Sequence, residues 1–520
     1  HPEVLYVTRS RGRVSRACPW KHLADGRLYE DFFIPTLIQV LDDYGFDGFY
    51  GANGFNPPRI SIYDADYSRD MIEQFHQHSG GALPDELAGG GDDDASSVEA
   101  RADWIWTNRR REWIDFYVQR RAAFWRKLAT SLHAEGKSVM TNSTWTKDPA
   151  ESIYRFGMDY RVLAKAGVDR VVLEAAAAAM ETIDDPNPAC RAVCQFAAAT
   201  LLTTATIPQM PTQWLNGVKD TCEDWDALRQ APMALESEIQ AYTHLYRRTP
   251  EGGLTHCVDG PMVCLADCIE SQEWQRLRDR WSAGFGFEPT HVHGITLVWS
   301  SALLDRQVDD IIATGRWSVH RWLSHLMARG AAVHTVVDIQ DLSPSAGPLL
   351  VLAAHLLPKS EREILQAYEG GPMVVVSDDE VLDAVPDASD APAPANPVFD
   401  AEVPTLFYDD LAWRPVPDQT LDACVAAINA CSRAAVQVTR GDDDLCVWAI
   451  EGADGVLRLL VRNDRHTRTE GTIELVRRVQ HVHYRNSATG KPIEPIDYLF
   501  HFTVPARGTA VFDVTFAETT

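Results

Sequence analysis

The sequence predicts an α/β protein: a (β/α)8 barrel of the TIM type, followed by a small Rossmann-like α/β domain and a C-terminal antiparallel β-sandwich. Three observations predict this order. Over residues 1–330, short apolar runs alternate with longer amphipathic runs, which is typical of βα units around a parallel sheet. A compact strand–helix–strand pattern follows over residues 333–376. Short alternating runs separated by turns then continue to the C-terminus, as in an antiparallel sheet.

The barrel strands are expected where apolar runs are continuous, because parallel strands are buried on both faces. The helix expected over residues 113–133 has apolar positions at helical spacing and is followed by Gly136. Further strands are expected around residues 203–207 and 254–258. The clearest predicted strands are residues 4–7, 48–50, 138–140, 170–173, 262–265 and 295–299.

Changes in composition predict the domain boundaries. The barrel, the predicted catalytic domain, is expected to span residues 1–316 and the small α/β domain residues 317–386. Residues 387–397 (DASDAPAPANP) are a Pro-rich linker, and residues 398–520 form the sandwich. The small domain lacks a G-x-G-x-x-G fingerprint after its first strand, so no dinucleotide and no other cofactor is predicted.

Charge and cysteine usage exclude several classes of partner. The formal net charge of −26 would repel a phosphate backbone, so nucleic acid is not expected as a partner. No apolar run approaches the roughly 20 residues that span a bilayer, so no membrane partner is expected. The ten cysteines are scattered, mostly in apolar contexts, and no signal-peptide pattern is visible. These features favour a cytoplasmic protein.

Several segments are similar to barrel glycosidases. Residues 44–50 (YGFDGFY) resemble one of their strands, and residues 66–75 (DYSRDMIEQF) resemble one of their helices. Val298-Trp299-Ser300 resembles their last barrel strand, and residues 349–376 resemble the core of their α/β domain. Together with the domain order, these segments resemble the family-42-type β-galactosidases.

The resemblance implies a glycoside hydrolase with a carbohydrate substrate, a pair of catalytic carboxylates, a retaining mechanism and assembly into a homo-oligomer. The family pattern places an Asn-Glu dipeptide after barrel strand 4, where the Glu is the general acid/base. This chain contains no Asn-Glu dipeptide, and the segment around Asn142 has the Asn without the Glu.

Two carboxylates directly follow apolar strands, where barrel enzymes place their active sites. Glu174 follows residues 171–173 and precedes a run of alanines, and burial there would suit a general acid. With residues 4–7 counted as the first strand, Glu174 ends strand 4, and Asp267 ends strand 7 in the nucleophile position. The alternative interpretations are a structural Glu bound to an Arg, and an N-cap for the helix after Asp267.

Six residues at or near predicted strand ends are expected to contact the sugar, because aromatic rings stack on its C–H faces and amides bind its hydroxyls. Residues 213–220 in particular mix aromatic, amide and charged side chains, as a binding loop would, although a packed loop is an alternative. The six residues are Asn53, Asn142, Trp145, Trp214, Asn216 and Trp299.

Two other functions stay open. One is a non-catalytic carbohydrate-binding or scaffold protein on the same fold, which the missing Asn-Glu dipeptide favours. The other is a metal-dependent barrel hydrolase that uses His291 and His293, although a His-x-His motif of that kind belongs on the first barrel strand rather than before the last. We therefore predict no metal ligands.

Overall fold

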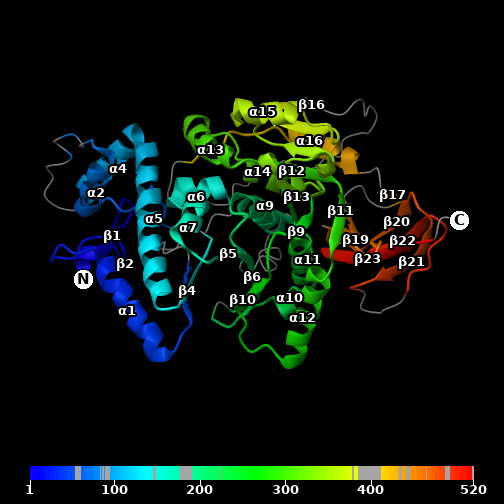
Figure 1. The fold of residues 1–520 in the computed structure, drawn as a ribbon, viewed down its shortest axis with the longest axis horizontal. Coiled ribbons are helices and arrows are strands. Elements are labelled where there is room, and N and C mark those ends of the chain that lie inside the picture. The colour runs from blue at the N-terminus through cyan, green and yellow to red at the C-terminus, as the bar shows by residue number, and fades with distance from the viewer. Residues whose placement is uncertain are drawn as a thin grey trace.

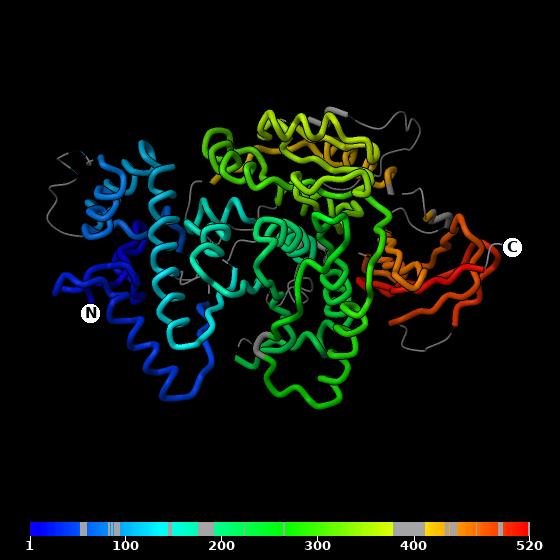
Figure 2. The backbone as a smooth tube through the Cα atoms, in the orientation of Figure 1, coloured from blue at the N-terminus to red at the C-terminus, as the bar shows by residue number. Residues whose placement is uncertain are grey.

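A computed structural model describes most of the chain (Figure 1). The fold runs from a group of N-terminal helices at one end to a sandwich of strands at the other, with two sheets and their helices between them (Figure 2). No helix in the described part of the chain combines the length and apolar character needed to cross a membrane. The described residues are 1–52, 60–81, 84, 87, 94–143, 148–175, 190–222, 224–377, 380–383, 411–432, 436–440, 445–463, 465–486 and 492–517.

The N-terminal segment forms a hairpin and not a barrel strand. Among the described residues, strand β1 (Leu5–Thr8) pairs only with β2 (Gly12–Ala17), and the pairing is antiparallel. The prediction that residues 4–7 are the first barrel strand is therefore wrong, although the residues are extended. The helices that the structure describes in this part of the chain are α1 (Tyr29–Tyr44), α2 (Arg69–Ser79), α4 (Ala95–Asn108) and α5 (Arg110–Ala134).

A parallel sheet occupies the centre of the molecule, with the strand order β10-β6-β5-β4-β3. Its members are β3 (Gly48–Gly51), β4 (Ser138–Asn142), β5 (Arg170–Ala175), β6 (Thr212–Asp220) and β10 (Pro261–Leu265), and the short β7 (Trp225–Asp226) pairs antiparallel to β6. Among the described residues this sheet is open, so they form a half-barrel and not the closed eight-stranded barrel that we predicted. Glu174 ends the third of the five parallel strands in chain order.

Local signals fix the helices that connect these strands. Asp148 caps α6 (Pro149–Phe156) by accepting a hydrogen bond from Ala150 N, and Gly157 ends that helix with a φ of 59°. Asp159 caps α7 (Tyr160–Ala166) in the same way, and Gly167 ends it. The chain can therefore return from β4 to the start of β5 in two short helices.

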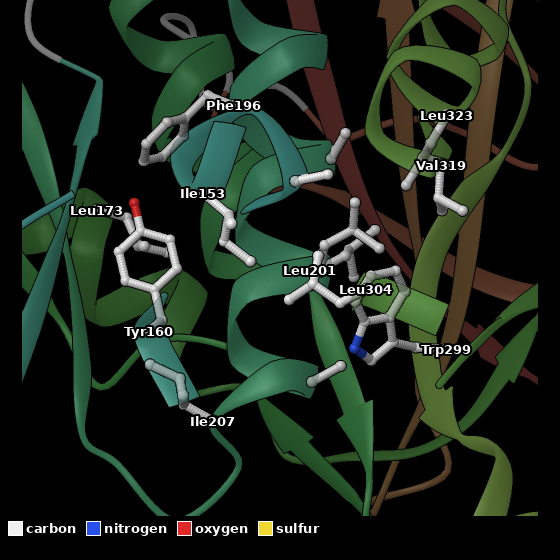
Figure 3. Packing of buried hydrophobic residues seen from close by; sticks show 14 of the residues in the cluster. Ile153, Tyr160, Leu173, Phe196, Leu201, Ile207, Trp299, Leu304, Val319 and Leu323 are labelled. Atoms are coloured by element: carbon white, nitrogen blue, oxygen red, sulfur yellow. The ribbon is translucent and has the colours of Figure 1, made fainter. Parts of the chain in front are cut away.

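Helix α9 (Cys190–Thr206) joins the central sheet to a second sheet. It packs against β5 on one side and against β13 (Val333–Asp338) on the other. Figure 3 shows the side chains of Phe196 and Leu201 from this helix in the buried layer between them. Residues 203–207, which we expected to form a strand, therefore lie at the end of a buried helix.

The second sheet has seven strands in the order β16-β15-β14-β12-β13-β8-β9. Strand β12 (Ile295–Trp299) pairs in parallel with β13 and β14, so it belongs to this sheet and not to the barrel sheet where we predicted it. The other strands are β8 (Tyr246–Arg248), β9 (Leu254–His256), β14 (Leu349–Val351), β15 (Met373–Ser377) and β16 (Glu380–Asp383). The predicted boundary between residues 316 and 317 thus separates strands of a single sheet.

Antiparallel strands complete the fold in two sheets that enclose a separate apolar core. One has the order β11-β18-β19-β23-β21 and the other β17-β20-β22. This confirms the antiparallel character predicted for the C-terminal region, while the predicted linker at residues 387–397 lies outside the described residues. The strands are β11 (Pro289–His293), β17 (Val436–Arg440), β18 (Leu445–Gly452), β19 (Leu457–Asn463), β20 (Thr469–Leu475), β21 (Val479–Tyr484), β22 (Leu499–Val504) and β23 (Gly508–Phe516).

The remaining helices cover the sheets. They are α10 (Ala227–Gln230), α11 (Pro232–Thr243), α12 (Ser271–Phe285), α13 (Ser301–Thr314), α14 (Val319–Ala328), α15 (Lys359–Gln366) and α16 (Asp418–Ser432).

Candidate active site

Glu174 lies at the carboxyl end of β5, the central strand of the parallel sheet. The preceding residues 171–173 are fully buried, whereas Glu174 itself is half-buried. The carboxyl ends of parallel strands form the mouth of a (β/α) sheet, where side chains from neighbouring strands converge. The prediction that Glu174 ends a strand of the parallel sheet is confirmed, and its catalytic role stays a prediction.

Two consecutive residues at the end of β4 hold Glu174. Asn142 Nδ2 donates a short hydrogen bond to Glu174 Oε2. Ser143 Oγ accepts a hydrogen bond of 2.9 Å from Glu174 N, and Ser143 N donates to Val172 O at 2.7 Å. The neighbouring strand thus fixes both the backbone and the carboxylate of Glu174. Sequence reasoning missed Ser143, although it directly follows Asn142 at the end of β4.

Asp267 occupies a strained turn directly after β10. Its neighbours Ala266 and Cys268 have φ values of 62° and 50°, a left-handed conformation that non-glycine residues seldom adopt. The half-buried Asp267 carboxylate accepts hydrogen bonds from Thr221 Oγ1 at 2.8 Å and from Thr221 N at 3.3 Å. Asp267 therefore ties the end of β10 to the end of β6.

The strand register separates Asp267 from Glu174. Glu174 pairs with Leu215 on β6, and Leu215 pairs with Met262 on β10. Thr221, to which Asp267 binds, lies six residues beyond Leu215, which corresponds to roughly 20 Å along an extended strand. The carboxylates of a retaining glycosidase lie about 5 Å apart, and those of an inverting one up to about 9.5 Å apart. The register therefore does not support the predicted pairing of Glu174 with Asp267.

Trp214 and Asn216 are buried on the other face of the sheet. They alternate along β6 with Leu215, the register partner of Glu174, so their side chains leave the opposite face. Trp214 Nε1 and Asn216 Nδ2 both donate to Glu238 Oε1 on α11, at 3.3 and 2.7 Å, and all three residues are fully buried. The segment that we interpreted as a binding loop is a core strand, and it does not bring these two residues to Glu174.

Of the other predicted sugar contacts, the structure describes Trp299, which does not lie near Glu174. Trp299 ends β12 in the second sheet, and its indole lies among Leu201, Leu304 and Val319 in the apolar core (Figure 3). Asn53 and Trp145 lie outside the described residues. Of the four predicted contacts that the structure describes, only Asn142 lies against Glu174.

His291 and His293, the residues of the alternative metal-dependent hydrolase, lie in β11. This strand pairs with β18 of the antiparallel region and is not part of the parallel sheet. His293 Nε2 lies 2.9 Å from Glu451 Oε1, and the rings of His291 and His293 are 4.7 Å apart. Across the described ranges, no three His, Cys, Asp or Glu side chains are arranged to hold a metal ion. This placement does not favour a metal-dependent hydrolase.

Comparison with known proteins supports the fold. No protein-family model and no curated protein matches the chain. Solved structures do match over almost its whole length. A catalytic mutant of Gan42B, a GH42 β-galactosidase from G. stearothermophilus, has a TM-score of 0.50 and 13% identity, and the match covers 99% of this chain and 85% of that chain. The β-galactosidase of the psychrophilic Marinomonas ef1 has a TM-score of 0.51 and 12% identity, with coverage of 99% and 87%. The chain therefore has a glycosidase fold similar to that of the GH42 β-galactosidases.

Proposed function

We propose that this chain is a glycoside hydrolase in which Glu174 is the general acid/base. The observation that carries the proposal is the position of Glu174 at the carboxyl end of the central parallel strand, held by Asn142 and Ser143. The β-galactosidases that share the fold support a β-galactoside as the first substrate to test. The chain has no Asn-Glu dipeptide, but an Asn on the neighbouring strand, Asn142, contacts Glu174.

In this reaction, protonated Glu174 gives its proton to the glycosidic oxygen as the bond between that oxygen and the anomeric carbon breaks. A second carboxylate attacks the anomeric carbon, or it activates a water molecule that does so. The register argues against Asp267 for this task. Asp148, buried after β4, is engaged in capping α6 and accepts a hydrogen bond from Ser318 Oγ. Neither Asp267 nor Asp148 is therefore assigned as the second carboxylate.

The test is hydrolysis of a panel of nitrophenyl glycosides, including the β-galactoside, by the purified protein and by its Glu174→Gln variant. Glu470→Gln is a matched control, because Glu470 is an exposed residue of the antiparallel region. We expect hydrolysis by the parent and the control. Glu174→Gln should lose activity, although less on nitrophenyl glycosides than on alkyl glycosides, because nitrophenolate needs less help from an acid to leave. Full activity of Glu174→Gln would remove Glu174 from the mechanism.

The separation of Glu174 from Asp267 favours one alternative, a carbohydrate-binding protein that does not cleave its ligand. Calorimetric titration with galactosides distinguishes the two functions. A galactoside that binds with a measurable heat, but from which no product forms over hours, would support the binding protein. Product formation that depends on Glu174 would support the hydrolase.

A further inference from the structure

We infer that Asn142 is a positioning residue for Glu174, which it holds so that Oε1 and not Oε2 carries and delivers the proton. This inference rests on the proposed role of Glu174 as general acid/base. It concerns the protonation of the carboxyl group and does not require Asn142 to touch the sugar.

The two side chains lie on one face of the sheet at adjacent strand ends. Asn142 pairs with Val172 in the parallel register, and Val172 lies two residues before Glu174 on β5. Side chains two residues apart on a strand share a face, so Asn142 and Glu174 point the same way. The contact between Asn142 Nδ2 and Glu174 Oε2 follows from this register.

The donor in this contact favours one carboxyl oxygen over the other as the site of the proton. An amide NH2 group only donates hydrogen bonds, so the oxygen that faces it must act as an acceptor. The carbonyl oxygen of a neutral carboxyl group is a better acceptor than its hydroxyl oxygen, so the contact favours Oε2 as the carbonyl oxygen and Oε1 as the oxygen that carries the proton. The same donor stabilises the charged carboxylate more than the neutral acid.

The surroundings hold both partners in place. Asn142 is almost fully buried at the end of β4, so its side chain has little freedom to turn away. Ser143 binds the backbone N of Glu174 and also the carbonyl of Val172, which fixes the start of the Glu174 side chain. Glu174 is thus held both at its backbone N and at Oε2, which limits the orientations of its carboxyl group.

The test is a titration of the Glu174 carboxyl group by 13C NMR in protein labelled at the glutamate carboxyl carbons, with Glu174→Gln identifying the signal. In Asn142→Asp an oxygen replaces the donor, so we expect the pKa of Glu174 to rise by roughly one unit or more above that of the parent. Asn142→Ala removes the donor without adding charge, and we expect a smaller rise. The alkaline limb of the kcat profile should move by the same amounts.

Thr141→Val is the matched control, because Thr141 precedes Asn142, points to the opposite face and donates to Gly51 O at 2.8 Å. It should cost stability and leave the Glu174 titration unchanged. An unshifted Glu174 signal in folded Asn142→Asp and Asn142→Ala would overturn the inference, even if Glu174→Gln is inactive. An active Glu174→Gln would instead overturn the proposed function, whatever the titration shows.

Discussion

Arg458 on β19 and Asp513 on β23 form an ion pair with two hydrogen bonds. Arg458 Nε lies 2.7 Å from Asp513 Oδ1, and Nη2 lies 3.0 Å from Oδ2. Arg458 Nη1 also donates to Ala283 O on α12 at 3.0 Å, and the guanidinium lies 4.1 Å from the ring centre of Phe287. Only 3% of Arg458 is exposed. This residue therefore joins the antiparallel region to the helices beside the parallel sheet.

Replacing Arg458 by Met should destabilise the fold, because it removes the buried partner of the Asp513 carboxylate and leaves the half-exposed Arg485 beside it. We expect a loss of about 3 kcal/mol in the free energy of unfolding, measured by urea denaturation. Arg468→Met is the control, since the pair of Arg468 with Glu470 has side chains that are 65% and 72% exposed. That variant should lose less than about 1 kcal/mol. Equal losses in the free energy of unfolding for the two variants would show that the buried ion pair of Arg458 adds no more stability than an exposed pair.

His334 should make the protein less stable in acid. Burial, aided by the charges of His293 and Arg248, lowers the pKa of His334 to about 3, from 6.5. Between these two values the unfolded chain binds a proton that the folded chain does not. The contribution of His334 to the free energy of unfolding is therefore fully present above pH 6.5. It falls by about 1.4 kcal/mol for each pH unit below that value.

The variant His334→Phe tests this pH dependence. Phenylalanine keeps the ring that stacks on Trp448 at 4.7 Å but cannot titrate. Urea denaturation at pH 7 and pH 5 should show that acid costs the parent about 2 kcal/mol more than it costs this variant. The exposed His481, changed to Gln, is a control that should follow the parent. If the parent and His334→Phe lost the same free energy of unfolding between pH 7 and pH 5, the lowered pKa of His334 would be contradicted.

Asn216 should contribute to stability and not to substrate binding. Asn216→Ala removes the donor to the buried Glu238 carboxylate and the acceptor of Trp281 Nε1, so we expect it to cost about 3 kcal/mol. Gln213→Ala, at a half-buried position of the same strand, should have a much smaller effect. Thermal melting measures both. A stable Asn216→Ala with a raised KM for glycosides would restore Asn216 as a sugar contact.

The sequence predicted four strands of the parallel sheet, because buried parallel strands are continuous apolar runs. It missed β6, whose polar Asn216 is satisfied by Glu238, 22 residues further along the chain. It also assigned a strand to the end of α9. There the hydroxyls of Thr204 and Thr206 each donate to the carbonyl four residues earlier, so a threonine-rich segment can be a buried helix.

For the candidate site, the position of Glu174 could be predicted from the sequence, but its pairing with Asp267 could not. Glu174 could be found because a carboxylate directly after an apolar strand is an unusual local pattern. Asp267 followed an equally apolar strand, but its partnership with Glu174 depended on counting residues 4–7 as a barrel strand. That count failed because β1 pairs with β2 instead, and antiparallel hairpin pairing cannot be distinguished from parallel pairing in a run of four residues.

The role of Glu174 is tested most directly by the dependence of Glu174→Ala hydrolysis on the leaving group. A general acid is needed for poor leaving groups and hardly at all for dinitrophenolate, which departs without a proton. We predict that Glu174→Ala loses several orders of magnitude in kcat/KM on alkyl or methyl glycosides but retains most of its kcat/KM on the dinitrophenyl glycoside of the same sugar. An equal loss on both substrates would contradict an acid/base role for Glu174.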